Sequence, residues 1–281
     1  MRLFGEITRF LSEQGIEDPA GEAELLITQT LHIDQPRLYT EDIEISPETL
    51  SIVKSLAARR ALGEPLQYII GHVEFYGLKI YIGKGVLIPR PETELLVEEV
   101  IKKIAGRTTS DDNLNLRILD LCTGSGCIAI ALTKNLPRAE VYGVDMSDAA
   151  LGYALRNAEQ NSVKNVSFLK GDLFGPVVEM GFNCIVCNPP YVKRGDIPGL
   201  QQEIRDYEPI EALDGGTDGL DFYRRILGEA PRYLYEDSFI ACEIGFDQGL
   251  AVEGIATEAG IRDVRILKDY AGLDRIFIGS R

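Results

Sequence analysis

The stretch Leu116-Arg-Ile-Leu-Asp-Leu-Cys-Thr-Gly-Ser-Gly-Cys-Ile-Ala-Ile130 decides the fold of this chain. Residues 116–121 have the length and the apolar character of a buried strand, and residues 125–135 continue as an apolar helix. Gly124 and Gly126 lie between the two, where glycine lets a ligand approach the backbone at a helix N-terminus. A strand, a glycine loop and a helix in this order are typical of a doubly wound α/β domain.

Short apolar segments alternate with amphipathic ones over the rest of the C-terminal part. This alternation predicts a parallel, doubly wound sheet with helices between its strands. The predicted strands are 116–121, 139–144, 166–170, 183–187 and 237–243, and the predicted helices are 125–135, 148–160, 219–231 and 247–259. Residues 264–267 and 275–279 have the pattern of two strands without a helix between them, so we expect an antiparallel pair to finish the sheet.

The residues before this region predict two other parts. Residues 1–70 carry apolar residues at helical spacing and predict a small helical bundle. Residues 71–88 change to the alternating, glycine-punctuated pattern of a β-hairpin. We expect this hairpin to connect the helical domain to an α/β domain over residues 89–281, in which the polar residues 107–115 form a surface loop.

Composition indicates a soluble globular protein of the cytoplasm. The chain has 281 residues, 45% of them hydrophobic and 26% charged, and no apolar run is long enough to span a membrane. Acidic residues come too early for a signal peptide. The cysteines lie inside apolar segments, which is typical of reduced thiols, and Cys184 and Cys187 would point to opposite faces of a strand. With only two histidines in the chain, we expect no metal site.

The net charge of −15 bears on the class of substrate. An acidic surface repels phosphate backbones, and the sequence has no run of lysine and arginine that would form a basic patch. A protein or a small molecule is therefore favoured over nucleic acid as the substrate.

Chemically useful residues follow several of the predicted strands. The carboxyl ends of parallel strands meet at one edge of a sheet, where ligands of such folds bind. Asp145 is placed there to accept from ribose hydroxyls. Asp172 could accept from an exocyclic amine, or the backbone of its neighbour could bind an adenine ring, although helix capping would also explain an acid at that position. The predicted cofactor-binding residues are Cys122, Thr123, Gly124, Ser125, Gly126, Asp145, Asp172, Leu173 and Asn188.

The strand at 183–187 ends abruptly in Asn188-Pro-Pro-Tyr191. Neither Pro189 nor Pro190 has a backbone N–H, and φ is fixed at both, so their carbonyl groups are held in place and free to accept hydrogen bonds. The Asn188 side chain adds a carbonyl acceptor, and Tyr191 adds a flat aromatic face. This corner could hold a planar NH₂ group: two acceptors take its hydrogens, the ring packs on its plane, and the nitrogen lone pair points toward an electrophile.

A helix is expected to open at Ile88-Pro-Arg-Pro-Glu-Thr-Glu94. Arg90 is a rigidly presented cation between two prolines, and we expect Arg90 and Glu92 to line the substrate side of the site. A well-formed helix start accounts for the same residues, because acids favour the positive end of a helix.

A dinucleotide site is the alternative from another class. Gly124-Ser-Gly-Cys-Ile-Ala129 fits the G-x-G-x-x-A pattern, with an acid about 20 residues further on. Two observations argue against a NAD-dependent oxidoreductase. We expect Asp120 and Asp145 to face the ligand, and two acids suit hydroxyls and a positive charge better than a pyrophosphate. The Asn-Pro-Pro-Tyr corner, moreover, has no role in hydride transfer.

The combined motifs resemble a known family. Asp120-x-Cys-x-Gly-x-Gly126, Asp145, Asp172 and Asn188-Pro-Pro-Tyr191 resemble the motifs of class I S-adenosylmethionine-dependent methyltransferases that act on planar nitrogens. With Ile88–Glu94, Leu213-Asp-Gly-Gly-Thr-Asp-Gly-Leu220 and the helical N-terminal domain, the chain is similar to the release factor glutamine methyltransferases along nearly its whole length. Cys122 departs from the family, which has a glycine there, so we expect that this position does not need a conformation restricted to glycine.

The resemblance implies a Rossmann-like sheet with an antiparallel last strand, S-adenosylmethionine as cofactor, and methylation of N5 of the glutamine in the Gly-Gly-Gln motif of bacterial peptide chain release factors. It implies that the N-terminal domain helps to hold this protein substrate, with no nucleic acid or membrane partner, and we expect a monomer. Asn188, Pro189 and Tyr191 are the expected catalytic residues, and Pro190, Arg90 and Glu92 complete the substrate site. An adenine N6-methyltransferase remains the closest alternative, because the same corner could hold the exocyclic amine of a flipped base.

Overall fold

The computed structural model describes residues 2–41, 43–106 and 116–281. The chain divides into two compact units, one formed by Met1–His72 and Gln201–Tyr207 and the other by Val73–Leu200 and Glu208–Arg281. The predicted surface loop at 107–115 lies outside the described residues. None of the helices in the described part of the chain is both long and apolar enough to cross a membrane.

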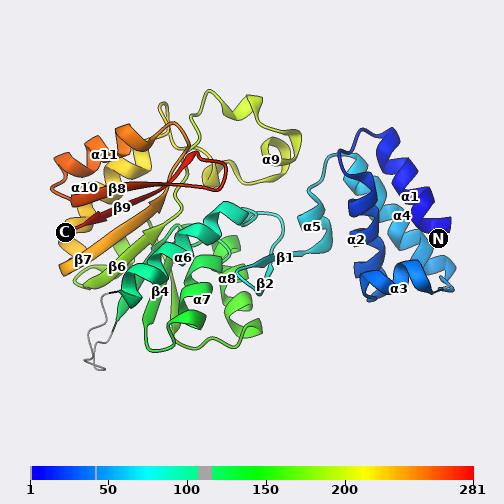
Figure 1. Ribbon diagram of the computed structural model, residues 1–281, viewed down its shortest axis with the longest axis horizontal. Helices are drawn as coiled ribbons and strands as arrows, with labels where there is room; N and C mark the ends of the chain where they lie inside the picture. Colours follow the sequence, from blue (N-terminus) through cyan, green and yellow to red (C-terminus); the bar gives the residue numbers. More distant parts are fainter. Residues whose placement is uncertain (1, 42, 107–115) are drawn as a thin grey trace. The chain divides into compact units, whose positions relative to one another are not determined.

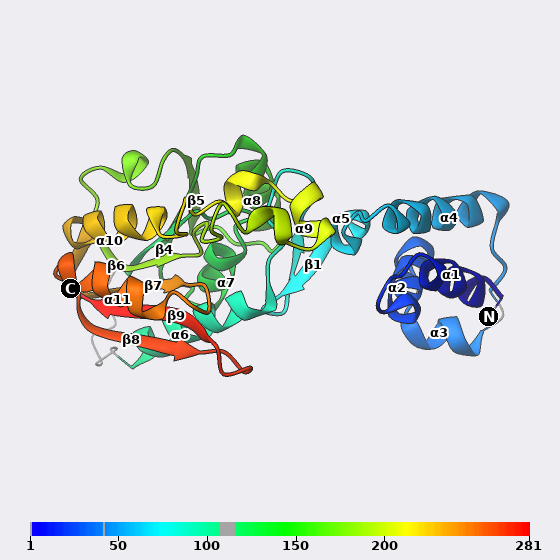
Figure 2. The same cartoon turned by 90° about the horizontal axis from the view of Figure 1, so that it is seen from above.

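The first unit is helical, as the sequence predicts, and Figures 1 and 2 show its helices from α1 to α4 gathered into a bundle. Its helices are α1 (Arg2–Glu13), α2 (Pro19–Leu31), α3 (Gln35–Thr40), α4 (Pro47–Ala61), α5 (Leu66–Ile70) and the returning α9 (Gln202–Tyr207). Asp18 and Ser46 cap α2 and α4, each followed by proline in the first turn. Buried Leu11, Leu26 and Val53 come from three of these helices and form part of one apolar core.

The second unit is built on a seven-stranded sheet with the order β5-β4-β3-β6-β7-β9-β8. The strands are β3 (Arg117–Leu121), β4 (Glu140–Asp145), β5 (Val166–Lys170), β6 (Phe182–Cys187), β7 (Leu234–Glu243), β8 (Arg262–Lys268) and β9 (Asp274–Ser280). The first five are parallel, and β9 is antiparallel to both β7 and β8. The predicted doubly wound sheet with an antiparallel end is confirmed.

Helices cover both faces of this sheet (Figure 1). On one face lie α6 (Pro91–Ala105), α7 (Cys127–Asn135) and α8 (Asp148–Gln160), and on the other lie α10 (Asp221–Tyr233) and α11 (Gly249–Glu258), which pack against each other (Figure 2). Between the sheet and α10 and α11, the core includes the fully buried rings of Phe182, Tyr223 and Phe277.

The predicted hairpin is present but shorter than expected. Its strands are β1 (His72–Phe75) and β2 (Leu78–Tyr81), and residues 82–90 continue without regular structure to the start of α6. Buried Asn157 of α8 holds β2 by accepting from the Tyr81 N–H (2.7 Å) and donating to the Tyr81 carbonyl (2.9 Å). The same amide donates to the Ser125 carbonyl (2.9 Å), so the hairpin and the glycine loop share one anchor.

Candidate functional site

The parallel strands end at one edge of the sheet, on a common row. The residues in register across this row are Leu169, Val144, Leu121, Cys187 and Cys242. Asp145, Cys122, Asn188 and Glu243 each stand one residue beyond it. Because neighbouring strands lie about 4.8 Å apart, these four residues lie at one edge of the sheet, and Asp145, Cys122 and Asn188 among them are predicted site residues.

The glycine loop turns sharply between β3 and α7. Gly124 and Gly126 have φ values of 56° and 78°, in the left-handed region that favours glycine. At Gly126 a Cβ would lie 3.0 Å from Ala154 and from Phe168, so this position also requires a residue without a side chain. Cys122 has φ of 57°, which a non-glycine residue adopts at an energetic cost. The structure therefore refines our expectation: the position is left-handed, although cysteine can occupy it.

Asp145 holds this loop in place. Its Oδ2 accepts from the Gly124 N–H (2.8 Å), and its Oδ1 accepts from the Ser147 N–H (2.9 Å) at the start of α8. Carboxylate oxygens have further lone pairs, so Asp145 can still accept from hydroxyl groups of a ligand.

Asp120 lies beneath the loop rather than at its surface. Its side chain is fully buried, and Oδ2 accepts from the Thr123 hydroxyl (2.6 Å) and the Ala129 N–H (3.2 Å). Oδ1 is buried and has no hydrogen-bond partner among the described residues. Burial raises the pKa of Asp120 to about 7, although the hydrogen bonds from Thr123 and Ala129 oppose the shift. An unpaired carboxylate oxygen under the loop favours a ligand that brings positive charge.

The end of β5 differs from the prediction for Asp172 in one respect. The Asp172 side chain is exposed and pairs with Arg225 of α10 (2.5 Å), so this carboxylate already has a cationic partner. The next residue, Leu173, is buried and has φ of 47°. Asp172 does not cap a helix through its side chain, because its carbonyl, not its carboxylate, accepts from the Gly175 N–H (3.0 Å).

The Asn188-Pro-Pro-Tyr191 corner follows β6 directly. Pro189 and Pro190 are buried, and Asn188 is half-buried. The Asn188 Nδ2 donates to the Thr93 hydroxyl (3.3 Å). Within the described part of the chain, no group donates to the Asn188 Oδ1 or to the Pro189 carbonyl oxygen. Both acceptors that the sequence assigns to a substrate NH₂ group are therefore open.

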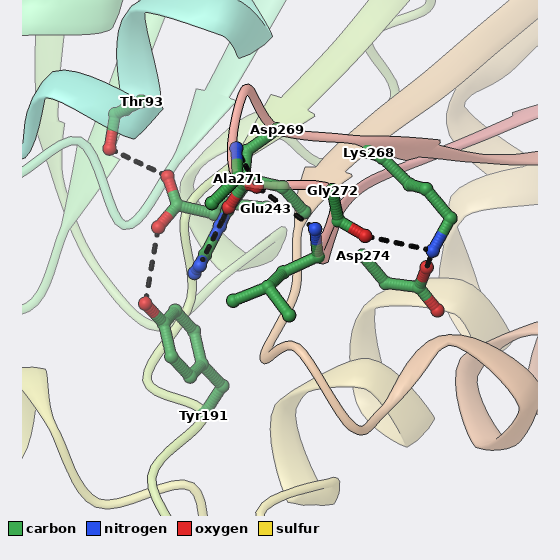
Figure 3. Close-up of polar contacts among 10 residues, drawn as sticks. Thr93, Tyr191, Glu243, Lys268, Asp269, Ala271, Gly272 and Asp274 are labelled. Atoms are coloured by element: carbon green, nitrogen blue, oxygen red, sulfur yellow. Dashed lines mark hydrogen bonds and ion pairs between the residues drawn. The ribbon is translucent and has the colours of Figure 1, made fainter.

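Glu243, at the end of β7, lies beside this corner. Its Oε2 accepts from the Thr93 hydroxyl (2.6 Å) and its Oε1 from the Tyr191 hydroxyl (3.2 Å). Figure 3 shows the carboxylate between the two hydroxyl groups. Burial raises the pKa of Glu243, while Thr93 and the guanidinium of Arg275 oppose that shift.

A glycine-rich loop at 213–220 supports the corner from the other side. The Gly215 N–H donates to the Val192 carbonyl (2.8 Å), and the Val192 N–H donates to the Leu213 carbonyl (2.9 Å). Buried Gln248 donates to the carbonyl oxygens of Tyr191 (3.0 Å) and Gly219 (3.1 Å). The loop at 213–220 therefore stabilises the backbone of the corner through hydrogen bonds.

Arg90 and Glu92 occupy the start of α6, as predicted. Arg90 donates to Glu208 (2.5 Å), whose buried carboxylate also accepts from the Ile88 N–H (3.1 Å). Glu92 is exposed in the first turn. The Arg90 cation is thus held by a buried acid, a pairing that the sequence did not suggest.

Sequence reasoning missed several supporting residues. Thr93, Asn157, Glu208 and Gln248 are buried polar residues, each with a partner that lies between 29 and 150 positions away in the chain. Glu243 differs from these four, because the sequence already marks it as a possible site residue: it is an acid at the end of the predicted strand at 237–243. The other four lie in amphipathic or loop segments, where a polar residue predicts nothing in particular.

Comparison with known proteins supports a methyltransferase. The pattern described as PrmC N-terminal domain matches residues 3–71, and the Methyltransferase small domain matches residues 92–204. The fold resembles that of a methyltransferase from Pyrococcus furiosus, with a TM-score of 0.52, 19% identity, and coverage of 84% of this chain and 98% of that one. This likeness shows the class I methyltransferase fold.

Two relatives show which methyltransferase family the chain belongs to. The release factor glutamine methyltransferase of Thermodesulfovibrio yellowstonii is 51% identical over 257 residues, which cover 92% of this chain and 91% of that protein. The protein of the same name from Geobacter sulfurreducens is 42% identical over 273 residues, covering 97% of this chain and 93% of its own. With the glycine loop, the strand-end acid and the open Asn-Pro-Pro-Tyr corner on one edge of the sheet, this chain belongs to the release factor glutamine methyltransferases.

Proposed function

We propose that this protein transfers a methyl group from S-adenosylmethionine to N5 of the glutamine in the Gly-Gly-Gln motif of bacterial peptide chain release factors. The observation that carries the proposal is the pair of open acceptors, the Asn188 Oδ1 and the Pro189 carbonyl oxygen, one strand away from the glycine loop. A primary amide has two hydrogens on a planar nitrogen, and two fixed acceptors match that group.

The residues around the loop fit the cofactor. Members of this methyltransferase family use S-adenosylmethionine, which carries ribose hydroxyls and two positively charged groups. The unpaired Asp120 Oδ1 favours positive charge, and Asp145 has free lone pairs for the hydroxyls. We propose that Cys122–Gly126, Asp145, Asp172, Leu173 and Asn188 hold the cofactor, with Leu173 acting through its backbone. When bound, the cofactor supplies an electrophilic methyl group.

The chain's own residues then orient the acceptor nitrogen. An amide nitrogen is a weak nucleophile, so alignment of nitrogen, methyl carbon and sulfur is the main contribution required. Asn188 and Pro189 accept the two amide hydrogens, and Tyr191 packs on the amide plane. As positive charge develops on the nitrogen, these acceptors bind more strongly than in the ground state. The proton leaves to water after transfer, so no histidine or cysteine base is needed.

We further propose that residues 1–70 help to hold the release factor, that Pro190, Arg90 and Glu92 line the substrate side, and that the enzyme works as a cytoplasmic monomer. The net charge of −15 supports a protein substrate over a polyphosphate one.

The decisive experiment supplies isotopically labelled S-adenosylmethionine together with either an unmodified bacterial release factor or duplex DNA. We expect label on the release factor, located by mass spectrometry on the glutamine of the Gly-Gly-Gln motif. Label on adenine, with the release factor unmodified, would instead establish the nucleic-acid alternative.

A further inference from the structure

We propose that Thr93 and Glu243 are positioning residues that set which way the Asn188 side-chain amide faces. This inference rests on the proposed function, because it concerns how Asn188 presents its oxygen to a substrate NH₂ group. Thr93 stands in the first turn of α6 and Glu243 at the end of β7, 150 residues later. Both side chains are buried, with exposed fractions of 2% and 1%.

The direction of each hydrogen bond follows from the number of protons available. A hydroxyl group has one proton and two lone pairs, and an ionised carboxylate has no proton. With Glu243 ionised, the Thr93 hydroxyl, which lies 2.6 Å from the Glu243 Oε2, must donate to it. Only lone pairs of the Thr93 oxygen then remain for Asn188, so the Asn188 group 3.3 Å away must be the NH₂.

This constraint matters because an asparagine amide is nearly symmetric in shape. Its oxygen and NH₂ group can exchange places at little steric cost, and only the surrounding hydrogen bonds select one orientation. With the NH₂ group held by Thr93, the Asn188 oxygen is directed to the remaining side, where no described group donates to it. In the reversed orientation, an NH₂ group would face the NH₂ group of the substrate.

Glu243 is well placed to remain an acceptor. Its second oxygen accepts from the Tyr191 hydroxyl (3.2 Å), so both oxygens receive protons from neutral donors. The Arg275 guanidinium of β9 attracts the carboxylate, which favours its charged form against the effect of burial. One carboxylate thereby fixes both Asn188, through Thr93, and the ring of Tyr191.

The test compares Thr93→Val, which keeps the shape and loses the hydroxyl, with Thr93→Ser, which keeps the hydroxyl. Thr133→Val is the matched control, because the buried Thr133 hydroxyl donates to the Ala129 carbonyl within α7, away from the corner. With an unmodified release factor and labelled S-adenosylmethionine, we expect Thr93→Val to lower kcat by roughly 10- to 100-fold. Thr93→Ser should restore most of this loss, Thr133→Val should retain wild-type kcat, and the cofactor Kd should change by less than about twofold.

A double variant separates positioning from general support. In an Asn188→Ala background, Thr93→Val should cause no further loss of kcat, since the residue through which it acts is gone. Full, multiplicative losses in the double variant would overturn the proposal, and so would wild-type kcat in Thr93→Val.

A variant that does not fold, or an enzyme that does not methylate glutamine, can be told apart from a failure of the positioning role. If Thr93→Val does not fold, Glu243→Leu decides. It removes the acceptor of the Thr93 proton, so the Thr93 hydroxyl is free to donate to the Asn188 oxygen and reverse the amide. We expect a comparable loss of kcat, and an unchanged kcat would refute the inference. If the wild-type enzyme does not methylate glutamine at all, the proposed function fails, independently of the role of Thr93.

Discussion

Asn188 is the residue on which the proposed chemistry depends most directly. Its oxygen accepts one substrate hydrogen and strengthens that bond as charge develops on the nitrogen. We expect Asn188→Ala to lower turnover by about 10²-fold or more while changing the cofactor Kd far less. Steady-state kinetics with a release factor and calorimetry with the cofactor measure the two quantities. Asn165→Ala is the control and should retain wild-type turnover, because the exposed Asn165 side chain donates to the Pro137 carbonyl. Unchanged turnover in Asn188→Ala would remove Asn188 from the mechanism.

The raised pKa of Asp120 predicts that cofactor binding depends on pH. Burial raises its pKa to about 7 from the ordinary value of 3.8, so the carboxyl is partly protonated near neutrality. Ionisation as the pH rises through 7 creates negative charge under the loop, which favours a positively charged ligand. Between pH 6 and 8 the Kd for S-adenosylmethionine should therefore fall by about tenfold more in the wild type than in Asp120→Asn. If the Kd for S-adenosylmethionine depended on pH in the same way in both proteins, the ionisation of Asp120 would not contribute to cofactor binding.

Cys122 shows how a single backbone angle limits a position. With φ of 57°, it tolerates residues that enter the left-handed region and disfavours β-branched ones. We expect Cys122→Val to destabilise the fold by about 1–2 kcal/mol more than Cys122→Asn, because asparagine adopts this conformation more readily. Urea denaturation measures the difference. Equal stability of the two variants would mean that φ at this position is not left-handed in solution.

Among the elements, the loop at 213–220 has the clearest structural requirement. A Cβ on Gly215 would lie 2.8 Å from the Tyr191 Cα and 2.9 Å from the carbonyl oxygens of Pro190 and Gly219, all of them backbone atoms. Since no side chain can rotate away, Gly215→Ala must displace the corner. We expect a loss of about 1–3 kcal/mol in stability, as for other overpacked sites, together with a lower kcat at nearly unchanged cofactor Kd.

Gly228 provides the control for this prediction. It lies inside α10, where a Cβ would meet open space, so Gly228→Ala should stabilise the protein by roughly 0.5–1 kcal/mol and leave kcat unchanged. If Gly215→Ala also retained wild-type kcat, the loop would be a turn without influence on the corner.

The elements also explain what the sequence could predict. Apolar strands with residues such as Asp145 and Asn188 immediately after them are local patterns, and parallel pairing alone brings their ends to one edge. The contact between Thr93 and Glu243 depends on α6 packing beside β7, across 150 residues, which no local pattern encodes. The short helices α3, α5 and α9, of five or six residues each, offer too few turns for helical periodicity to be recognised.

At the scale of the whole molecule, the two units are not the two consecutive stretches of the chain that the sequence predicts. Residues 201–207 belong to the helical unit although they follow the Asn-Pro-Pro-Tyr corner in the chain. Buried Arg60 of α4 holds them there: it donates to Glu203 of α9 (2.6 Å) and, through two bonds, to Glu22 of α2 (2.6 and 3.1 Å). A buried arginine with two acidic partners is a connection that charge patterns along the chain do not reveal.

This connection gives a prediction for the helical unit. Arg60→Met keeps much of the side-chain volume but leaves Glu22 and Glu203 without their partner. Removing one member of a buried ion pair costs about 3–5 kcal/mol, and we expect the lower end because both glutamates are partly exposed. Arg59→Met is the matched control, since Arg59 pairs with Glu64 at the surface and should contribute less than about 1 kcal/mol. Hydrogen exchange should report faster opening of residues 201–207 and of α2 in Arg60→Met only, with the cofactor Kd unchanged. Equal protection in both variants would mean that the hydrogen bonds from Gln202 and Tyr207 to the Leu62 carbonyl hold the segment in the helical unit, and that the Arg60 cluster adds nothing to them.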